Sequence, residues 1–123
     1  MSDNLRQRLG AQGEQSAHDF LVAKGFRCRE RNFRLRGGEI DLIMEDGVYL
    51  VFVEVKRRRS LDYGAAEEAV TALKIRRMTK TAVSYIARYQ LTQRMVRFDV
   101  VTVDESGLHH FPNAFEASGD YYF

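Results

Sequence analysis

The stretch VFVEVKRRR, residues 51–59, limits the fold of this chain more than any other. Apolar side chains occupy both faces of an extended segment from Val51 to Val55, which is typical of a strand covered on both sides of a sheet. Glu54 and Lys56 stand near the end of this strand and, being two residues apart, point to the same face. Because an unpaired charge is costly to bury, this acid and this base require an explanation.

The length and composition favour one domain that spans residues 1–123. Apolar residues make up 45% of the chain and charged residues 29%, which allows a core and a soluble surface. No apolar run approaches the length that spans a bilayer, and the first ten residues lack the apolar segment of a secretory signal. Cys28 is the only cysteine, which agrees with a reducing compartment. We therefore expect a cytoplasmic protein without a membrane partner.

Positive charge is unevenly distributed along the chain. Residues 56–97 hold eleven Lys or Arg against three acids, and residues 98–123 hold five acids and no Lys or Arg. A second basic run, residues 27–36, contains five Arg and one Glu. Clusters of this density indicate a polyanion partner, nucleic acid first; a solvated basic surface is an equal alternative on charge alone.

The order of patterns is helix, three strands, helix, strand, with a short strand at the end. The turn EDG predicts that the second and third strands form an antiparallel hairpin, and the long helix then crosses back over the sheet. This order predicts a mixed α/β or α+β sandwich of helices against a small twisted sheet. The expected elements are helices at 4–24 and 66–89, and strands at 26–35, 37–45, 48–56, 95–103 and 108–111.

The hairpin brings a second acid toward the unexplained pair. Asp41 on the second strand lies across the predicted turn from Glu54, thirteen residues further on. Two carboxylates about 5 Å apart repel by about 3 kcal/mol at an effective dielectric near 20, and Lys56 offsets this only in part. A hard divalent cation offsets it well and can orient a phosphodiester and activate water. The alternative for Glu54 and Lys56 is a surface ion pair of little energetic value.

These residues carry a resemblance to a known family. GEIDLI followed by VFVEVK resembles the PD-(D/E)XK motif of the restriction-endonuclease-like nuclease superfamily, in which an Asp is followed one strand later by Glu-x-Lys. More narrowly, the chain is similar nearly throughout to the YraN-like family of uncharacterised bacterial proteins, related in fold to archaeal Holliday junction resolvases. The segments involved are GAQGEQSAHDFLVAKGF, RNFRLRGGEIDLI, VFVEVKRR, EEAVTALKIRRM and VRFDVVTV. The resemblance implies an α/β fold with a restriction-endonuclease-like αβββαβ core, a small mixed sheet flanked by helices.

The same resemblance implies a role for each matching residue. Asp41 and Glu54 match the metal-binding acids, the backbone carbonyl of Val55 would be a further ligand, and Lys56 matches the catalytic lysine. Glu14 on the first helix matches an acid that approaches the metal in resolvase-like relatives, often through water. The implied cofactor is Mg²⁺ or Mn²⁺, and because resolvase relatives act as dimers, a homodimer is open.

Other polar residues receive more modest expectations. Glu39 shares the face of Asp41 by spacing and would support the metal ligands from outside. Asp99 is expected to pair with a nearby Arg, and His109 and His110 are expected at the surface. For the basic residues near the cleft, nucleic-acid binding competes with a solvated surface, most evenly for the two on the long helix. The candidate nucleic-acid-binding residues are Arg34, Arg36, Arg57, Arg58, Arg59, Lys74 and Arg77.

The leading interpretation is a Mg²⁺- or Mn²⁺-dependent phosphodiesterase that acts on DNA rather than RNA, by attack of activated water. Cleavage of branched or damaged DNA fits better than sequence-specific cleavage, because the chain has no obvious reading helix or accessory domain. A nucleic-acid-binding module without turnover is the second interpretation. An accessory subunit that docks an acidic protein is the third.

Overall fold

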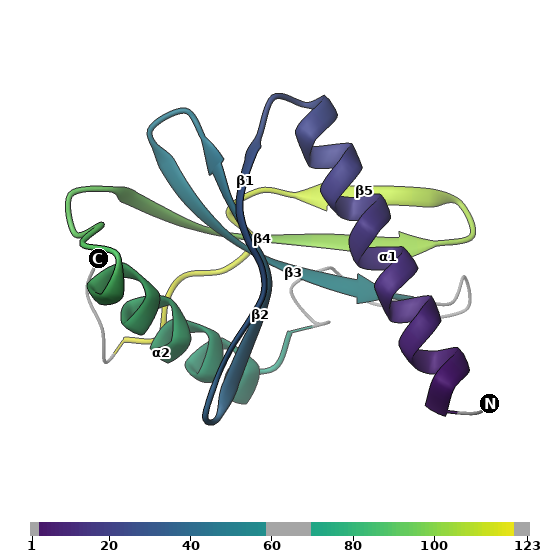
Figure 1. The fold of residues 1–123 in the computed structure, drawn as a ribbon, viewed down its shortest axis with the longest axis horizontal. Helices are drawn as coiled ribbons and strands as arrows, with labels where there is room; N and C mark the ends of the chain where they lie inside the picture. The colour runs from purple at the N-terminus through teal and green to yellow at the C-terminus, as the bar shows by residue number, and fades with distance from the viewer. Residues whose placement is uncertain (1–2, 59–69, 120–123) are drawn as a thin grey trace.

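The computed structural model describes residues 3–58 and 70–119 of the chain. Within these residues, two helices and five strands follow one another in the order that the sequence pattern predicts (Figure 1). Arg59, the loop expected at Gly64 and the first four residues of the expected second helix lie outside the described residues. The elements are α1 (Asp3–Ala23), β1 (Arg27–Leu35), β2 (Gly38–Asp46), β3 (Tyr49–Arg57), α2 (Ala72–Arg88), β4 (Met95–Asp104) and β5 (Gly107–Phe111).

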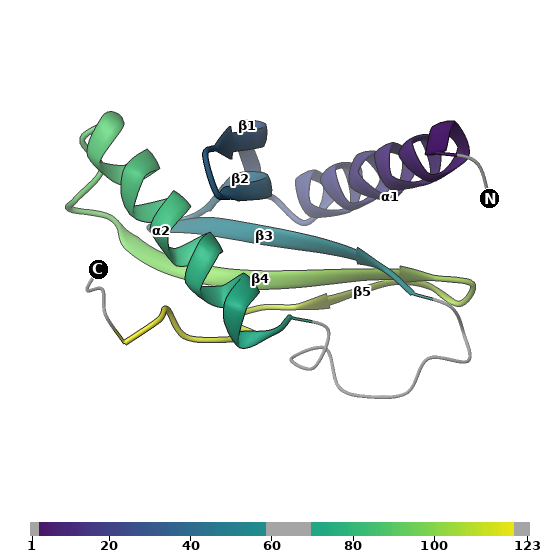
Figure 2. The same ribbon diagram turned by 90° about the horizontal axis from the view of Figure 1, so that it is seen from below.

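The five strands form one sheet in the order β1-β2-β3-β4-β5. Every neighbouring pair is antiparallel except β3 and β4. These two strands are parallel because α2 brings the chain back to the end of the sheet at which β3 begins. The sheet is flanked by α1 and α2, as Figures 1 and 2 show. The mixed α/β fold with a small αβββαβ core is therefore confirmed. Neither helix has an apolar stretch of the length that a bilayer crossing requires, within the residues described.

Each helix packs against its own apolar cluster, which explains why β3 is apolar on both faces. The cluster under α2 contains Phe52 and Tyr85, and the cluster under α1 contains Val53 and Leu21. All of β3 from Leu50 to Val53 is 0% exposed. The sequence pattern of VFVEV thus reports a strand sandwiched between two helices.

The end of α1 follows the glycine signal in the sequence. Gly25 has φ 99°, the left-handed conformation that glycine adopts at low cost. The backbone N–H of Phe26 donates to the carbonyl of Leu21 at 3.0 Å, and the N–H of Gly25 donates to Val22. These bonds close the last turn of the helix and direct the chain into β1.

The second helix begins later than the residue pattern predicts. Thr71 is extended, with φ −72° and ψ 162°, and its hydroxyl accepts a hydrogen bond from the backbone N–H of Lys74. This N-cap starts α2 at Ala72, so Val70 and Thr71 are not helical, contrary to the expected start at residue 66. Leu73, in the first turn of α2, is 53% exposed.

A buried polar network joins β4 to β5. Asp99 is 0% exposed and accepts hydrogen bonds from Arg97 Nε and Nη2 at 2.9 Å each, and from the backbone N–H of Asn113 at 2.9 Å. His110 Nε2 lies 2.7 Å from Asp99 Oδ2, and the His110 side chain is 3% exposed. The expected pairing of Asp99 with an arginine is confirmed. The expectation of a surface position is wrong for His110, because β4–β5 pairing brings it onto Asp99.

The tip of the β1–β2 hairpin separates from β3 and leans on α2. The β2–β3 register ends at the pair Leu42–Val53, whereas β2 continues to pair with β1 as far as Gly38. In Figure 1 this tip extends away from the rest of the sheet, between the two helices. A Cβ atom built at Gly38 would lie 2.1 Å from Thr81 Oγ1 and 3.0 Å from the Arg77 carbonyl oxygen. The absence of a side chain at Gly38 therefore lets the hairpin contact α2.

We expect Gly38→Ala to lower the free energy of unfolding by about 1–3 kcal/mol, because the added methyl must displace either the Thr81 side chain or the α2 backbone. Urea unfolding measures the change. Gly10→Ala is the matched control, since no atom lies within 4 Å of a Cβ at that helical position. A cost for Gly38→Ala no larger than for the control would contradict the tight contact.

Candidate active site

Two acidic side chains meet where the β2–β3 ladder ends. The last register pair is Leu42–Val53, so Asp41 and Glu54 are the next residues along the two strands. Beyond this point the hairpin tip leaves β3, and the carboxylates stand at the opening between the strands. The predicted approach of Asp41 to Glu54 across the turn therefore agrees with the register.

The Asp41 side chain replaces a backbone carbonyl as hydrogen-bond acceptor where the β2–β3 pairing ends. Its Oδ2 accepts from the backbone N–H of Val55 at 2.8 Å, which fixes the carboxylate beside β3. In an extended strand the N–H and C=O of one residue point to the same edge, so the carbonyl of Val55 is directed toward β2 as well. The three oxygen groups that the sequence suggested as metal ligands, from Asp41, Glu54 and Val55, thus lie in one neighbourhood.

Glu54 is a buried acid with one satisfied and one unsatisfied oxygen. The residue is 7% exposed. Its Oε1 lies 3.2 Å from Lys74 Nζ of α2. Its Oε2 is fully buried and has no hydrogen-bond partner among residues 3–58 and 70–119. Because a buried carboxylate oxygen without a partner is costly, this atom indicates either a bound proton or a cation ligand.

The electrostatics of the pair reflect this crowding. The pKa of Asp41 is raised to about 8, first by burial and then by the charges of Glu54 and Glu14, which together outweigh the Val55 hydrogen bond and the charge of Lys74. Burial also raises the pKa of Glu54, against the charges of Lys74 and Lys56. Two adjacent acids whose pKa values are both raised resist carrying two negative charges. Such perturbed groups at a strand end are typical of functional sites.

Two adjoining hollows flank the acids. The first has a volume of about 610 Å³ and lies between α1 and the hairpin, where Glu14, Glu39 and Asp41 line it. The second, of about 580 Å³, lies between the hairpin tip and α2, where Lys74 and Arg77 line it. Arg34 and Glu39 line both hollows, and their ion pair of 3.1 Å separates them.

The structure brings together the acidic candidates that the sequence proposed. Glu14 faces the same hollow as Asp41, and its charge contributes to the raised pKa of Asp41. Gly13, which precedes it, is buried, with its Cβ position 4.0 Å from Val103, so α1 lies against the sheet at this point. Glu39 lines the hollow too and acts electrostatically on Glu54.

The basic candidates divide into three groups. Lys56 and Arg57 are exposed at the end of β3, where Lys56 acts electrostatically on Glu54 and Arg57 donates to the Leu9 carbonyl at 3.4 Å. The next residue, Arg58, is partly buried, and its backbone N–H donates to Val103. Arg36 lies apart from the acids, in a groove of about 300 Å³ that α2 also lines.

Sequence reasoning missed two features of the site. Lys74 was expected to hold phosphate, whereas its ammonium contacts Glu54; a lysine in the first turn of a helix without any acid there was the available signal. Gly10 and Ala11 form part of the wall of the first hollow. The small residues of GAQGE, one turn before Glu14, could have suggested that helix face.

The donor set fits a hard cation only in part. Carboxylate and carbonyl oxygens are the ligands that Mg²⁺ and Mn²⁺ prefer, and Glu54 Oε2 is available to bind one. Across residues 3–58 and 70–119, however, no group of three or more His, Cys, Asp or Glu side chains could hold a metal ion alone. A cation here would therefore complete its coordination with the Val55 carbonyl, water and substrate oxygens, as Mg²⁺ commonly does.

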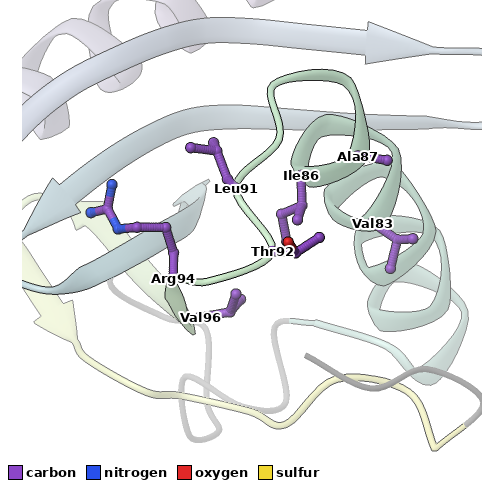
Figure 3. A pocket seen from close by; sticks show the side chains of 7 residues that line it. All are labelled: Val83, Ile86, Ala87, Leu91, Thr92, Arg94 and Val96. Carbon is purple, nitrogen blue, oxygen red and sulfur yellow. The ribbon is translucent and has the colours of Figure 1, made fainter.

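An apolar cavity of about 170 Å³ lies elsewhere, at the C-terminal end of α2 (Figure 3). Val83, Ile86, Leu91 and Val96 line it, together with Arg94, whose guanidinium is paired with Glu45 at 2.9 Å. None of the described residues that line this cavity is acidic.

The fold and the site define a small mixed α/β protein with paired acids at the mouth of a splayed hairpin. Residues 13–103 match the Uncharacterised protein family UPF0102, and the chain belongs to this family, which confirms the resemblance to YraN-like proteins. A UPF0102 protein of Symbiobacterium thermophilum is 52% identical over 100 residues, covering 81% of this chain and 85% of that protein. A UPF0102 protein of Trichlorobacter lovleyi is 45% identical over 116 residues, covering 89% and 91%. One of Geobacter metallireducens is 44% identical over 112 residues, covering 88% and 92%.

Proposed function

We propose that this protein is a metal-dependent nuclease of the restriction-endonuclease-like PD-(D/E)XK superfamily that hydrolyses phosphodiester bonds of DNA. Branched or damaged DNA is the preferred substrate class. The observation that carries the proposal is the buried pair Asp41 and Glu54, with Glu54 Oε2 lacking a partner in the part of the chain that the structure describes. Such an arrangement is unfavourable for stability and becomes favourable when a divalent cation binds.

The residues of the chain would divide the chemistry among them. Asp41, Glu54 and the Val55 carbonyl would hold Mg²⁺ or Mn²⁺, which supplies a Lewis acid and lowers the pKa of a bound water. Asp41 is kept in orientation by the Val55 N–H. Lys56, exposed beside the acids, would neutralise negative charge that develops on the phosphate and help position the attacking water. Glu14 would bind water from the α1 side.

The basic residues would bind the nucleic-acid backbone. Lys74 and Arg77 line the hollow on the α2 side, and Arg34 stands between both hollows. Arg34 and Glu39 line both hollows, so a phosphate held by Lys74 and Arg77 would lie next to the hollow that Asp41 lines. Arg36, Arg57 and Arg58 remain candidates for contacts outside these hollows, and Arg59, beyond the described residues, stays a candidate from the sequence alone. A homodimer would extend this surface.

One observation favours a nucleic-acid-binding module without turnover as the second candidate. Lys74 already neutralises one oxygen of Glu54, and no cation site made only of side chains is found among the described residues. Such a module would bind DNA with a steep dependence on salt concentration and would gain no thermal stability from Mg²⁺.

The test is cleavage of flaps, four-way junctions, single strands and plasmid by purified protein in Mg²⁺ or Mn²⁺. We expect Lys56→Ala to lower the cleavage rate by about 10²–10⁴-fold, because the variant loses the cation nearest the reacting phosphate. Lys80→Ala, which removes an exposed cation further along α2, should stay within about threefold of the wild type. Cleavage that survives Lys56→Ala undiminished would point to a contaminating nuclease and overturn the assignment.

A further inference from the structure

The ion pair between Lys74 and Glu54 has two unequal members. The Glu54 side chain is 10% exposed, whereas the Lys74 side chain is 43% exposed, and the atoms Nζ and Oε1 lie 3.2 Å apart. The carboxylate is thus fixed in the interior at the end of β3. The ammonium reaches it from the solvent side on a long flexible stem and has room to leave.

The start of α2 is an unfavourable place for a cation. The N-terminus of a helix carries partial positive charge, and the first turn of α2 contains no acidic residue. Lys74 is the third residue of the helix, and Arg76 and Arg77 follow within the next turn. The helix dipole and the charges of Arg76 and Arg77 both disfavour the Lys74 ammonium at this position. Its presence here therefore indicates that it binds a negatively charged group.

Lys74 has two such partners within reach. Glu54 is the partner seen in the structure. The second is any anion in the hollow of about 580 Å³ that Lys74 lines together with Arg34 and Arg77. A lysine is suited to change between the two, because its ammonium is a point charge that needs no fixed orientation.

We propose that Lys74 is an exchanging counter-ion of the site. Its ammonium neutralises Glu54 when no divalent cation is bound, and it contacts a phosphate of the nucleic acid when Glu54 holds the cation. This inference rests on the proposed function, because it requires both ligands. Lys74 is then a positioning residue through which each ligand favours the other: a polyanion that attracts Lys74 frees Glu54, and a cation at Glu54 frees Lys74.

The first test is the affinity for Mg²⁺ alone, measured by isothermal titration calorimetry at pH 8.5 without nucleic acid. Lys74→Gln is expected to bind Mg²⁺ about three- to tenfold more tightly than the wild type, because no ammonium competes for Glu54. Lys74→Arg keeps the charge and should remain near the wild-type affinity. Arg77→Gln, which removes a cation of the same hollow that is not paired with Glu54, is the matched control and should not change Mg²⁺ affinity.

The second test measures the coupling in proteins that also carry Lys56→Ala, so that the nucleic acid stays intact. A short single-stranded oligonucleotide should raise the affinity for Mg²⁺ in both proteins. The increase should be smaller in the Lys74→Gln protein, by at least about threefold, because Glu54 is already free there. Unchanged or weaker Mg²⁺ binding by Lys74→Gln, with the oligonucleotide effect retained, would overturn the exchange. If the wild type itself binds no Mg²⁺, the proposed function fails together with the exchange. If the wild type binds Mg²⁺ and Lys74→Gln binds it with the same affinity, the exchange alone fails.

Discussion

Asp41→Asn should yield a protein that no longer cleaves DNA and yet unfolds at a higher urea concentration than the wild type. The pKa of the Asp41 carboxyl is about 8, raised mainly by burial and then by Glu54 and Glu14. Asparagine removes the charge but keeps an oxygen that can accept from the Val55 N–H. The variant therefore loses a cation ligand, and cleavage should fall by at least about 10³-fold, while the repulsion with Glu54 disappears.

The gain in stability should depend on pH. A carboxyl whose pKa is raised on folding binds its proton more tightly in the folded state, so the wild type loses stability as pH rises from about 4 to about 8. The difference between Asp41→Asn and wild type should thus be near zero at pH 4 and about 2–3 kcal/mol at pH 8.5, less than the full linkage value because Asp41 and Glu54 can share one proton.

Asp46→Asn on the same strand is the control for this prediction. Asp46 is 41% exposed and pairs with Arg97 at 3.0 Å, so its substitution should lower the free energy of unfolding slightly and leave cleavage unchanged. An Asp41→Asn protein that is less stable than wild type at pH 8.5 would show that the carboxylate is not under electrostatic strain. The argument for a cation at this place would then lose its main support.

Asp99→Ala should cost about 3–5 kcal/mol of unfolding free energy at pH 7, enough to unfold much of a marginally stable domain. The substitution leaves Arg97, 13% exposed, and His110, 3% exposed, without their common acceptor. Burial by itself raises the pKa of Asp99, but hydrogen bonds from His110, Arg97 and the Asn113 backbone outweigh it and hold the pKa below its usual value. The carboxylate therefore contributes stability above about pH 4, and this contribution disappears as pH falls further.

Adjacent histidines supply a matched pair of variants for the same network. His110→Ala should destabilise the protein, because it removes a donor to Asp99 and the partner of Lys24 Nζ, which lies 2.8 Å from His110 Nδ1. His109→Ala should unfold close to wild type, since the His109 side chain is 45% exposed. Equal effects of the two substitutions, measured by urea unfolding, would contradict the role assigned to the buried network.

Local patterns in the sequence were sufficient for the sheet and for the acid pair. The apolar run ending at Glu54 fixes a strand covered on both faces, and the tight turn at Asp46 and Gly47 fixes the hairpin. Together they place Asp41 and Glu54 near one another across the hairpin, and the structure adds that pairing ends at Leu42–Val53, just before these two acids. These features depend on residues close together in the chain, where periodicity and turn chemistry are informative.

The features that sequence reasoning missed depend on contacts between distant elements. His110 is buried because β5 pairs with β4 and places it on Asp99. The start of α2 depends on the cap at Thr71, and a start several residues earlier hides the fact that Lys74 belongs to the first turn. The contact of Lys74 with Glu54 depends on where α2 lies along β3. The apolar periodicity of a single helix does not determine that position.

The most direct test of the account is anomalous diffraction from crystals of the wild type grown with Mn²⁺. We predict a manganese peak within coordination distance of both Asp41 and Glu54, with Lys74 no longer in contact with Glu54, and no such peak in Asp41→Asn crystals. Crystals at saturating Mn²⁺ that show no metal at these carboxylates and Lys74 still paired with Glu54 would contradict it.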